Sequence, residues 1–188
     1  MSMTVKRTRD VRTPRVMIHK TADVRGGVSV ATSELGGDYL PEGAVLSAPV
    51  DGICHVVKVA VLTAAAAAAD KQIKVAKHHC FKAGDAVMAA EGGVAVKVES
   101  VDSSGKTSDT ITLSAALGAL AAGAAVALAA EVGDDGAALK YAPQSVNGTG
   151  KNFSPTSNLD TDAWLIGVTK GNVLPSFVEK GLKGIVNI

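Results

Sequence analysis

The residues with the clearest chemical potential lie in the stretch KVAKHHCFKAGDAV, where His78, His79 and Cys80 are consecutive. A second Cys-His pair, Cys54 and His55, lies upstream. Imidazole and thiolate groups are common zinc ligands, and a thiolate beside an imidazole is also the nucleophile-base pair of thiol enzymes. The first question is therefore whether these side chains can meet around one ion or one substrate.

Their spacing argues against such a meeting. Adjacent residues of a strand point to opposite faces, so His78 and His79 cannot converge on one ion if this segment is extended. Structural zinc motifs separate their ligands by two to four residues, and neither cysteine has such a companion. We therefore predict no metal and no other cofactor. One alternative stays open, because two neighbouring strands could assemble a metal-binding or thiol-enzyme site. Its members would be Cys54, His55, His79 and Cys80.

The rest of the chain carries no recognisable catalytic signature. It has no GxSxG, HExxH, P-loop or dinucleotide fingerprint. The GDDG run at residues 133–136 lacks the other ligands of a calcium loop and is typical of a hairpin tip. FKAGDAV predicts a β corner in which Phe81 enters the core and Asp85 binds turn amides. We predict that the protein is not an enzyme and has no catalytic residues.

The composition favours a sheet-based core. Apolar residues make up 47% of the 188 residues but aromatic residues only 3%, so each core side chain buries little area and subunit contacts would supplement it. Two cysteines are too few for a disulfide scaffold, and no secretory segment follows the basic start, so we expect synthesis in a reducing cytoplasm. The uncharged run 111–130 is mostly alanine and glycine, and we expect no membrane span.

Short apolar runs separated by turn residues recur along most of the chain, which predicts antiparallel β structure. The pattern resets near Gln72, so residues 70–131 are predicted to form a β module inserted into a body made of residues 26–69 and 132–188. ICHVVKVAVL predicts one buried strand, and residues 64–69 predict a helical turn or connector. The predicted fold class is mainly β, with a small antiparallel barrel or sandwich body, the inserted β module, a short C-terminal helix and an extended N-terminal arm.

Positive charge is concentrated at the N-terminus, although the formal net charge of the chain is only +1. Residues 1–25 hold seven basic and two acidic residues, whereas the remainder holds twelve basic and sixteen acidic ones. Pro14 and the absence of a helical period predict that residues 1–25 are an extended arm that orders on a partner. This arm has no aromatic residue on which a base could stack, so nucleic acid is not an expected partner.

The order of these pieces resembles that of a family of virion proteins. GGDYLPEGAVLSAPVDG looks like the opening strand of tailed-phage head decoration proteins. DAWLIGVTKGNVLPSFVEKGLKGIVNI is similar to their ending, with a strand, a turn, Leu-Pro, a short helix and a terminal strand. The middle, from IKVAKHHCF through ITL to AAGAAV, resembles β modules of phage virion proteins. Together the resemblance covers residues 26–188 and rests on pattern and order.

This resemblance implies a head decoration or head fibre protein, also called a capsid auxiliary protein. Such proteins are non-enzymatic, usually homotrimeric, and lie on the outer surface of the virion's shell. The implied partners are the major capsid protein and other copies of the chain, after synthesis in the host cytoplasm. The basic arm is expected to attach to an acidic or strand-edge surface of the capsid. The expected contacts are Arg7, Arg9, Arg12 and Arg15, with Val16, Met17 and Ile18 as the apolar component.

Overall fold

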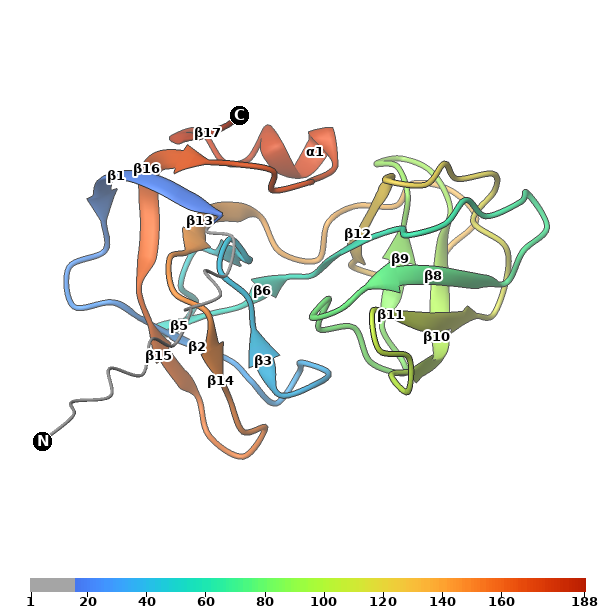
Figure 1. Ribbon diagram of the computed structural model, residues 1–188, viewed down its shortest axis with the longest axis horizontal. Coiled ribbons are helices and arrows are strands. Elements are labelled where there is room, and N and C mark those ends of the chain that lie inside the picture. The colour runs from blue at the N-terminus through green and yellow to red at the C-terminus, as the bar shows by residue number, and fades with distance from the viewer. Residues whose placement is uncertain (1–15) are drawn as a thin grey trace, which may run out of the picture.

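A computed structural model describes residues 16–188, which fold into two lobes (Figure 1). The body lobe is built from both ends of this part of the chain, residues 16–57 and 143–188. The module lobe is built from residues 59–139, between them. The chain leaves the body at Lys58 and returns through residues 140–142. The predicted mainly β fold class is confirmed, since the described residues form seventeen short strands and one helix of four residues.

The largest sheet of the body lobe has the order β1-β16-β13-β4-β6, with β17 also paired to β16. Its strands are β1 (Met17–Asp23), β4 (Val45–Ser47), β6 (Val56–Val57), β13 (Pro143–Asn147), β16 (Ala163–Thr169) and β17 (Ile185–Asn187). All of these pairs are antiparallel except β16 with β17. The predicted C-terminal helix and final strand are confirmed as α1 (Ser176–Glu179) and β17. Val178 and Leu182 pack with Met17 and Val146 in one cluster, so the helical end covers one side of this sheet.

Two small sheets complete the body lobe. Strand β2 (Val28–Val30) lies between β15 (Leu159–Thr161) and β5 (Ile53–Cys54), and β3 (Tyr39–Leu40) pairs with β14 (Lys151–Asn152). The side chains that they bury form a second cluster, which also contains a cysteine from each lobe, Cys54 and Cys80. No sheet of residues 16–188 closes into a barrel.

The module lobe is a six-stranded antiparallel sheet with the order β7-β12-β9-β10-β11-β8. Its strands are β7 (Val59–Val61), β8 (Gln72–Ala76), β9 (Ala86–Met88), β10 (Ala95–Asp102), β11 (Ser108–Leu113) and β12 (Ala125–Ala129). The β corner before β9 forms as predicted. Phe81 is buried in the lobe's core, Gly84 takes a φ of +95°, and the Asp85 carboxylate accepts the Lys82 N–H at 2.9 Å.

The lobe boundaries differ from the predicted ones. Strand β7 pairs with β12, so the module begins at Val59 rather than at residue 70. Leu139 still bridges to Ala129, so the module also ends later than residue 131. The reason is that ICHVVKVAVL is not one strand. It is buried over most of its length, as predicted, but it divides into β5, β6 and β7, which belong to three different sheets.

Residues 64–69 were predicted to form a helical turn or connector; they do connect β7 to β8, but they form no helical turn. Ala66 bridges to Leu120, and the Asp70 carboxylate accepts the Ala67 N–H at 2.7 Å. A run of six alanines is too short to hold a helix in water without an apolar face to bury. Among residues 16–188 no helix is long and apolar enough to cross a membrane. The uncharged run 111–130 contributes instead to β11 and β12.

The N-terminal arm, predicted to reach residue 25, is shorter than that. Residues 17–23 form β1, which is paired with β16, and the Met17 side chain is only 5% exposed. The sequence has no helical period here, but an edge strand needs none, since its apolar residues only have to face the core at a few points. Residues 1–15 lie outside the described part of the chain.

Candidate functional site

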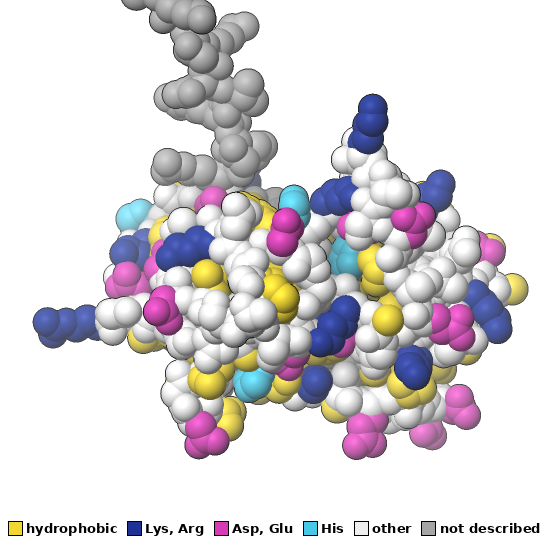
Figure 2. Space-filling model, turned by 90° about the horizontal axis from the view of Figure 1, so that it is seen from below, with side chains coloured by type: hydrophobic (Ala, Val, Ile, Leu, Met, Phe, Trp, Pro, Cys, Tyr) yellow, Lys and Arg dark blue, Asp and Glu magenta, His cyan; other side chains and the backbone are white. Residues whose placement is uncertain are grey.

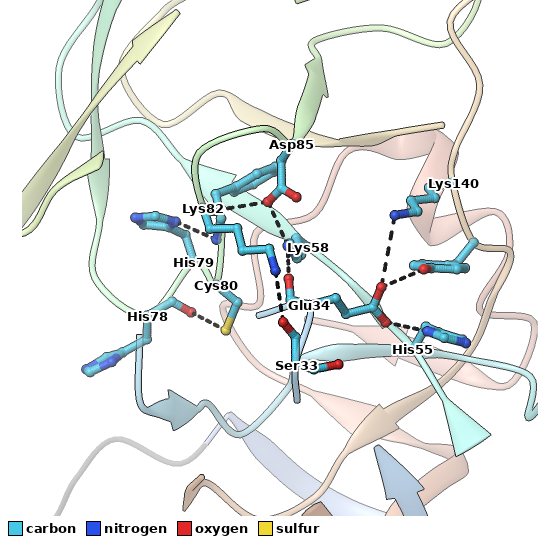
Figure 3. Close-up of polar contacts among 12 residues, drawn as sticks. Ser33, Glu34, His55, Lys58, His78, His79, Cys80, Lys82, Asp85 and Lys140 are labelled. Carbon is cyan, nitrogen blue, oxygen red and sulfur yellow. Dashed lines mark hydrogen bonds and ion pairs between the residues drawn. The ribbon is translucent and has the colours of Figure 1, made fainter. Parts of the chain in front are cut away.

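Six polar side chains meet where the two lobes join, and we call them the junction cluster (Figure 3). They come from a loop of the body, from the residue between β5 and β6, from both crossings between the lobes and from the β corner of the module. The members are Glu34, His55, Lys58, Asp85, Lys140 and Tyr141. The junction cluster thus links residues of both lobes through polar contacts.

Lys58 is the centre of one half of the junction cluster. Its side chain is 2% exposed, and its Nζ donates at 2.6 Å both to the Asp85 carboxylate and to the Glu34 carbonyl oxygen. Burial lowers the pKa of Lys58, and the Asp85 carboxylate opposes that shift by favouring the charged form. A buried ammonium group is tolerated only when it is paired and hydrogen-bonded, and here a residue of each lobe supplies one partner.

Glu34 is the centre of the other half. Its carboxylate bonds to Nδ1 of His55 and accepts the Tyr141 hydroxyl at 2.6 Å, with Nζ of Lys140 at 4.0 Å. Burial alone would raise the pKa of Glu34, but the hydrogen bonds from Tyr141 and His55 and the positive charges of His55 and Lys140 outweigh it and leave the pKa lowered. Burial and the Glu34 carboxylate raise the pKa of Tyr141. The His55 ring stacks on Tyr141 with 4.3 Å between centroids.

This arrangement has only part of what nucleophilic catalysis requires. A histidine oriented by a carboxylate is two thirds of a triad, but the third member must be an activated nucleophile. The Tyr141 hydroxyl is donated to Glu34, and both cysteines are buried. Burial raises the pKa of the Cys54 thiol and raises that of Cys80 to about 12, whereas reactive cysteines are thiolates at neutral pH. What the cluster does show is contact between the lobes, since Lys58 bonds both to Glu34 of the body and to Asp85 of the module.

The His-His-Cys segment is a loop rather than a strand. His78 and Cys80 both take positive φ values, +64° and +59°, which are uncommon for residues other than glycine. These two left-handed residues direct the three side chains to different places. His78 lies against Tyr39 with 4.8 Å between ring centroids, His79 enters the module lobe, and Cys80 enters the core of the body lobe.

His79 uses both of its ring nitrogens inside the protein. Its Nδ1 accepts the Phe81 N–H at 3.0 Å, and its Nε2 lies 3.3 Å from the Asp109 carboxylate. His55 faces Glu34, away from His79 and Cys80 (Figure 3). Cys54 and Cys80 pack in one apolar cluster to which neither histidine belongs, so the four side chains have no common focus. Among residues 16–188 no group of three or more His, Cys, Asp or Glu side chains is placed to hold a metal ion.

His79 predicts a loss of stability in weak acid. Burial lowers its pKa, against the opposing effect of Asp109, so the unfolded chain binds a proton more readily than the folded one. Stability should then fall as pH drops below about 6.5, the ordinary histidine value. Urea unfolding at pH 7.5 and 5.5 measures this. His79→Asn, which keeps an acceptor for the Phe81 N–H, should reduce the pH dependence. His78→Asn, at an exposed position, should leave the pH dependence unchanged. If the unfolding free energy changed equally between the two pH values in both variants, the assignment to His79 would be contradicted.

The structure divides the predicted capsid-binding residues. Arg7, Arg9, Arg12 and Arg15 lie outside the described residues. Met17 is a core residue whose N–H donates to the Glu42 carboxylate at 2.7 Å, so its assignment as an apolar contact for a partner is wrong. Val16 is half-buried and lines a cavity of about 440 Å³ between the lobes, while Ile18 is exposed. Of the three apolar residues, Ile18 is the one that a partner could reach freely.

One feature of the sequence could have predicted part of the junction cluster. Lys58 is the only charged residue in the apolar run ICHVVKVAVL, and a lysine in a buried run must find a carboxylate or carbonyl partner. Sequence reasoning treated Asp85 as a turn residue and did not single out Glu34, Lys140 or Tyr141. Glu34 and Tyr141 are 107 residues apart, and only the return of the chain from the module brings them together.

Comparisons with known proteins supply no relative for this chain. No family model, no curated protein and no solved structure matches it.

Proposed function

We propose that this chain is a non-enzymatic structural protein of a tailed-bacteriophage virion that decorates the outer surface of the capsid. The body lobe would attach to the shell, and the module lobe would be displayed away from it. The proposed partners are the major capsid protein and further copies of the chain in a homotrimer. Trimer formation would multiply weak contacts with the shell through avidity.

The observation that carries the proposal is the way the basic N-terminal segment joins the body. Strand β1 follows this segment directly and is paired with β16 from Met17 to Asp23. Met17 is buried in the same cluster as Val178 and Leu182, so β1 is held by core packing as well as by sheet hydrogen bonds. A load on residues 1–15 would therefore be transmitted to the core of the body lobe, which is what a surface attachment requires.

The distribution of charge supports the same assignment. Acidic and basic side chains are interspersed over the face of both lobes shown in Figure 2. By contrast, residues 1–15 hold five basic residues and one acidic residue. Arginine pairs with carboxylates through two parallel hydrogen bonds and keeps its charge when partly desolvated, which suits attachment to an acidic surface.

The alternative of a thiol or metal site gains no support from the geometry. Both cysteines are buried, His79 is internally bonded through both nitrogens, and His55 is held by Glu34. We therefore propose the structural function alone.

Replacing Arg7, Arg9, Arg12 and Arg15 together by glutamate should weaken binding to the capsids of the phage that encodes the chain. If each exposed ion pair is worth about 0.5 kcal/mol, losing four corresponds to about 30-fold in affinity. Co-sedimentation with purified capsids at several salt concentrations measures this. Replacement of the same four residues by lysine is the matched control and should keep most of the binding, because it preserves the charge. Equal binding of the glutamate and lysine variants would rule out attachment through this segment.

A further inference from the structure

The cavity of about 440 Å³ between the two lobes is the feature that the proposed function does not use, and we call it the interlobe cavity. Its body side is formed mainly by residues 41–45, by β6 and by residues 171–174, and its module side by β7 and residues 76–80. The volume falls in the range of about 300–1,000 Å³ that small-molecule sites occupy, and junctions between domains are a preferred place for such sites.

The module side of the cavity presents aliphatic side chains because of strand alternation. Ala60 belongs to the core of the module lobe, so Val59 and Val61 on either side of it face away from that core, toward the cavity. On β8, Val75 is a core residue, and Ala76 next to it lines the cavity. The backs of these two strands therefore form an apolar wall.

The lining as a whole is aliphatic. Of the twenty described residues that line the cavity, eleven are valine, alanine, leucine or proline, and none is phenylalanine, tyrosine or tryptophan. The rings of His78 and His79 already lie against Tyr39 and Phe81. The cavity thus offers small and branched aliphatic surface, but no large aromatic ring on which a flat ligand could stack.

The polar side chains of the lining are already bonded within the protein. Lys58 and His79 have the partners described above. Nζ of Lys77 donates to a backbone carbonyl oxygen at 2.8 Å and to a carboxylate, and the Asn172 side-chain amide donates to a carbonyl oxygen at 2.9 Å. A Glu42 oxygen accepts the first N–H of β1. A charged group placed deep in the cavity would therefore lose water without gaining an unpaired cation among the described residues, which disfavours it.

The mouth of the cavity is marked by the lining residues that are exposed to solvent, His78, Gly171 and Val173. Val173 is 46% exposed and is one of the few large hydrophobic side chains that the described chain leaves in water. An apolar ligand that entered here would cover this side chain, and removal of its surface from water would favour binding.

We infer that the interlobe cavity is a binding site for a single alkyl chain, such as the hydrocarbon tail of a fatty acid or of another amphiphile. The chain would lie against Val59, Val61 and Ala76, and its polar end would stay in water at the mouth, beside His78 and Val173. Because the walls come from both lobes, a bound chain would contact the body and the module together. Binding here requires no capsid, so the site is independent of the proposed function.

The first test is titration calorimetry of the full chain with dodecanoate, each ligand being kept below its micelle concentration. Dodecanoate should bind at one site per chain, and decanoate should bind about tenfold more weakly, because it buries two fewer methylene groups. 2-Naphthoate carries the same carboxylate on a flat rigid group and should bind at least about tenfold more weakly than dodecanoate. No binding of dodecanoate, or equal binding of all three ligands, would overturn the inference.

A second test places the ligand in the cavity. Ala76→Phe fills the cavity from its module side and should weaken dodecanoate binding at least about tenfold. Ala122→Phe makes the same change at an exposed turn of the same lobe and should leave binding unchanged. Circular dichroism verifies the fold, and Ala76→Leu replaces Ala76→Phe if that variant does not fold. Equal binding by the unaltered chain and the cavity variant would place the ligand elsewhere and overturn the inference.

Co-sedimentation with phosphatidylcholine vesicles distinguishes the two sources of an alkyl chain. If neither the unaltered chain nor Ala76→Phe sediments with the vesicles, a free amphiphile is the source. If the unaltered chain sediments and Ala76→Phe does not, a bilayer lipid supplies the chain to the same cavity.

Discussion

Asp85→Ala should lower the free energy of unfolding by about 3–5 kcal/mol, because it leaves the Lys58 ammonium group buried without its carboxylate. Lys58 is 2% exposed, and water cannot easily replace the missing partner. The same change also removes the acceptor of the Lys82 N–H in the β corner. Urea unfolding followed by circular dichroism at pH 7.5 measures the loss.

Two controls separate the ion pair from general damage. Asp134→Ala removes an exposed aspartate of the same lobe and should change stability by less than about 0.5 kcal/mol. The double variant Lys58→Met with Asp85→Leu removes both charges and should be more stable than Asp85→Ala alone. A cost below about 1 kcal/mol for Asp85→Ala would mean that Lys58 reaches water without it and that the junction cluster does not hold the lobes.

Truncation at the N-terminus should have two distinct results. Removing residues 1–15 keeps every contact of the described chain, so stability should be unchanged. Removing residues 1–23 also deletes β1 and should destabilise the body lobe strongly. Burial of Met17 alone contributes about 1.5–3 kcal/mol, and each lost sheet hydrogen bond contributes about 1 kcal/mol. Thermal unfolding of the two truncated proteins provides the comparison, and equal midpoints would show that β1 adds nothing to the core.

Local patterns in the sequence predicted the parts of the fold that depend on neighbouring residues. Alternating apolar residues and recurrent turns indicated the β class, and the corner at Phe81 and Asp85 followed from its own few residues. The division of residues 53–61 among three sheets could not be predicted from local patterns, because three short strands and one long strand have the same apolar pattern. The alanine run at residues 64–69 was misjudged because helix propensity was weighed without an apolar face to bury.

For the candidate site, too, local patterns predicted some features, whereas contacts between distant residues could not be predicted. The spacing of Cys54, His55, His79 and Cys80 argued against a shared metal site. In the structure the two cysteines share one apolar cluster, whereas His55 faces Glu34 and His79 bonds to the Phe81 N–H. The argument from strand geometry was nevertheless incomplete, because His78 and Cys80 take left-handed conformations that no strand contains. Contacts such as that of Glu34 with Tyr141 depend on the path of the whole chain, which no local pattern contains.

The most direct test of the proposed function is the occupancy of capsids by the unaltered chain. Purified protein is mixed with undecorated capsids of the phage proposed to encode it, at near-physiological salt, and bound copies are counted by cryo-electron microscopy. The proposal predicts ordered density on the outer surface at symmetry-related positions, with the body lobe against the shell and the module lobe outermost. Folded protein that leaves the capsids bare under these conditions would contradict it.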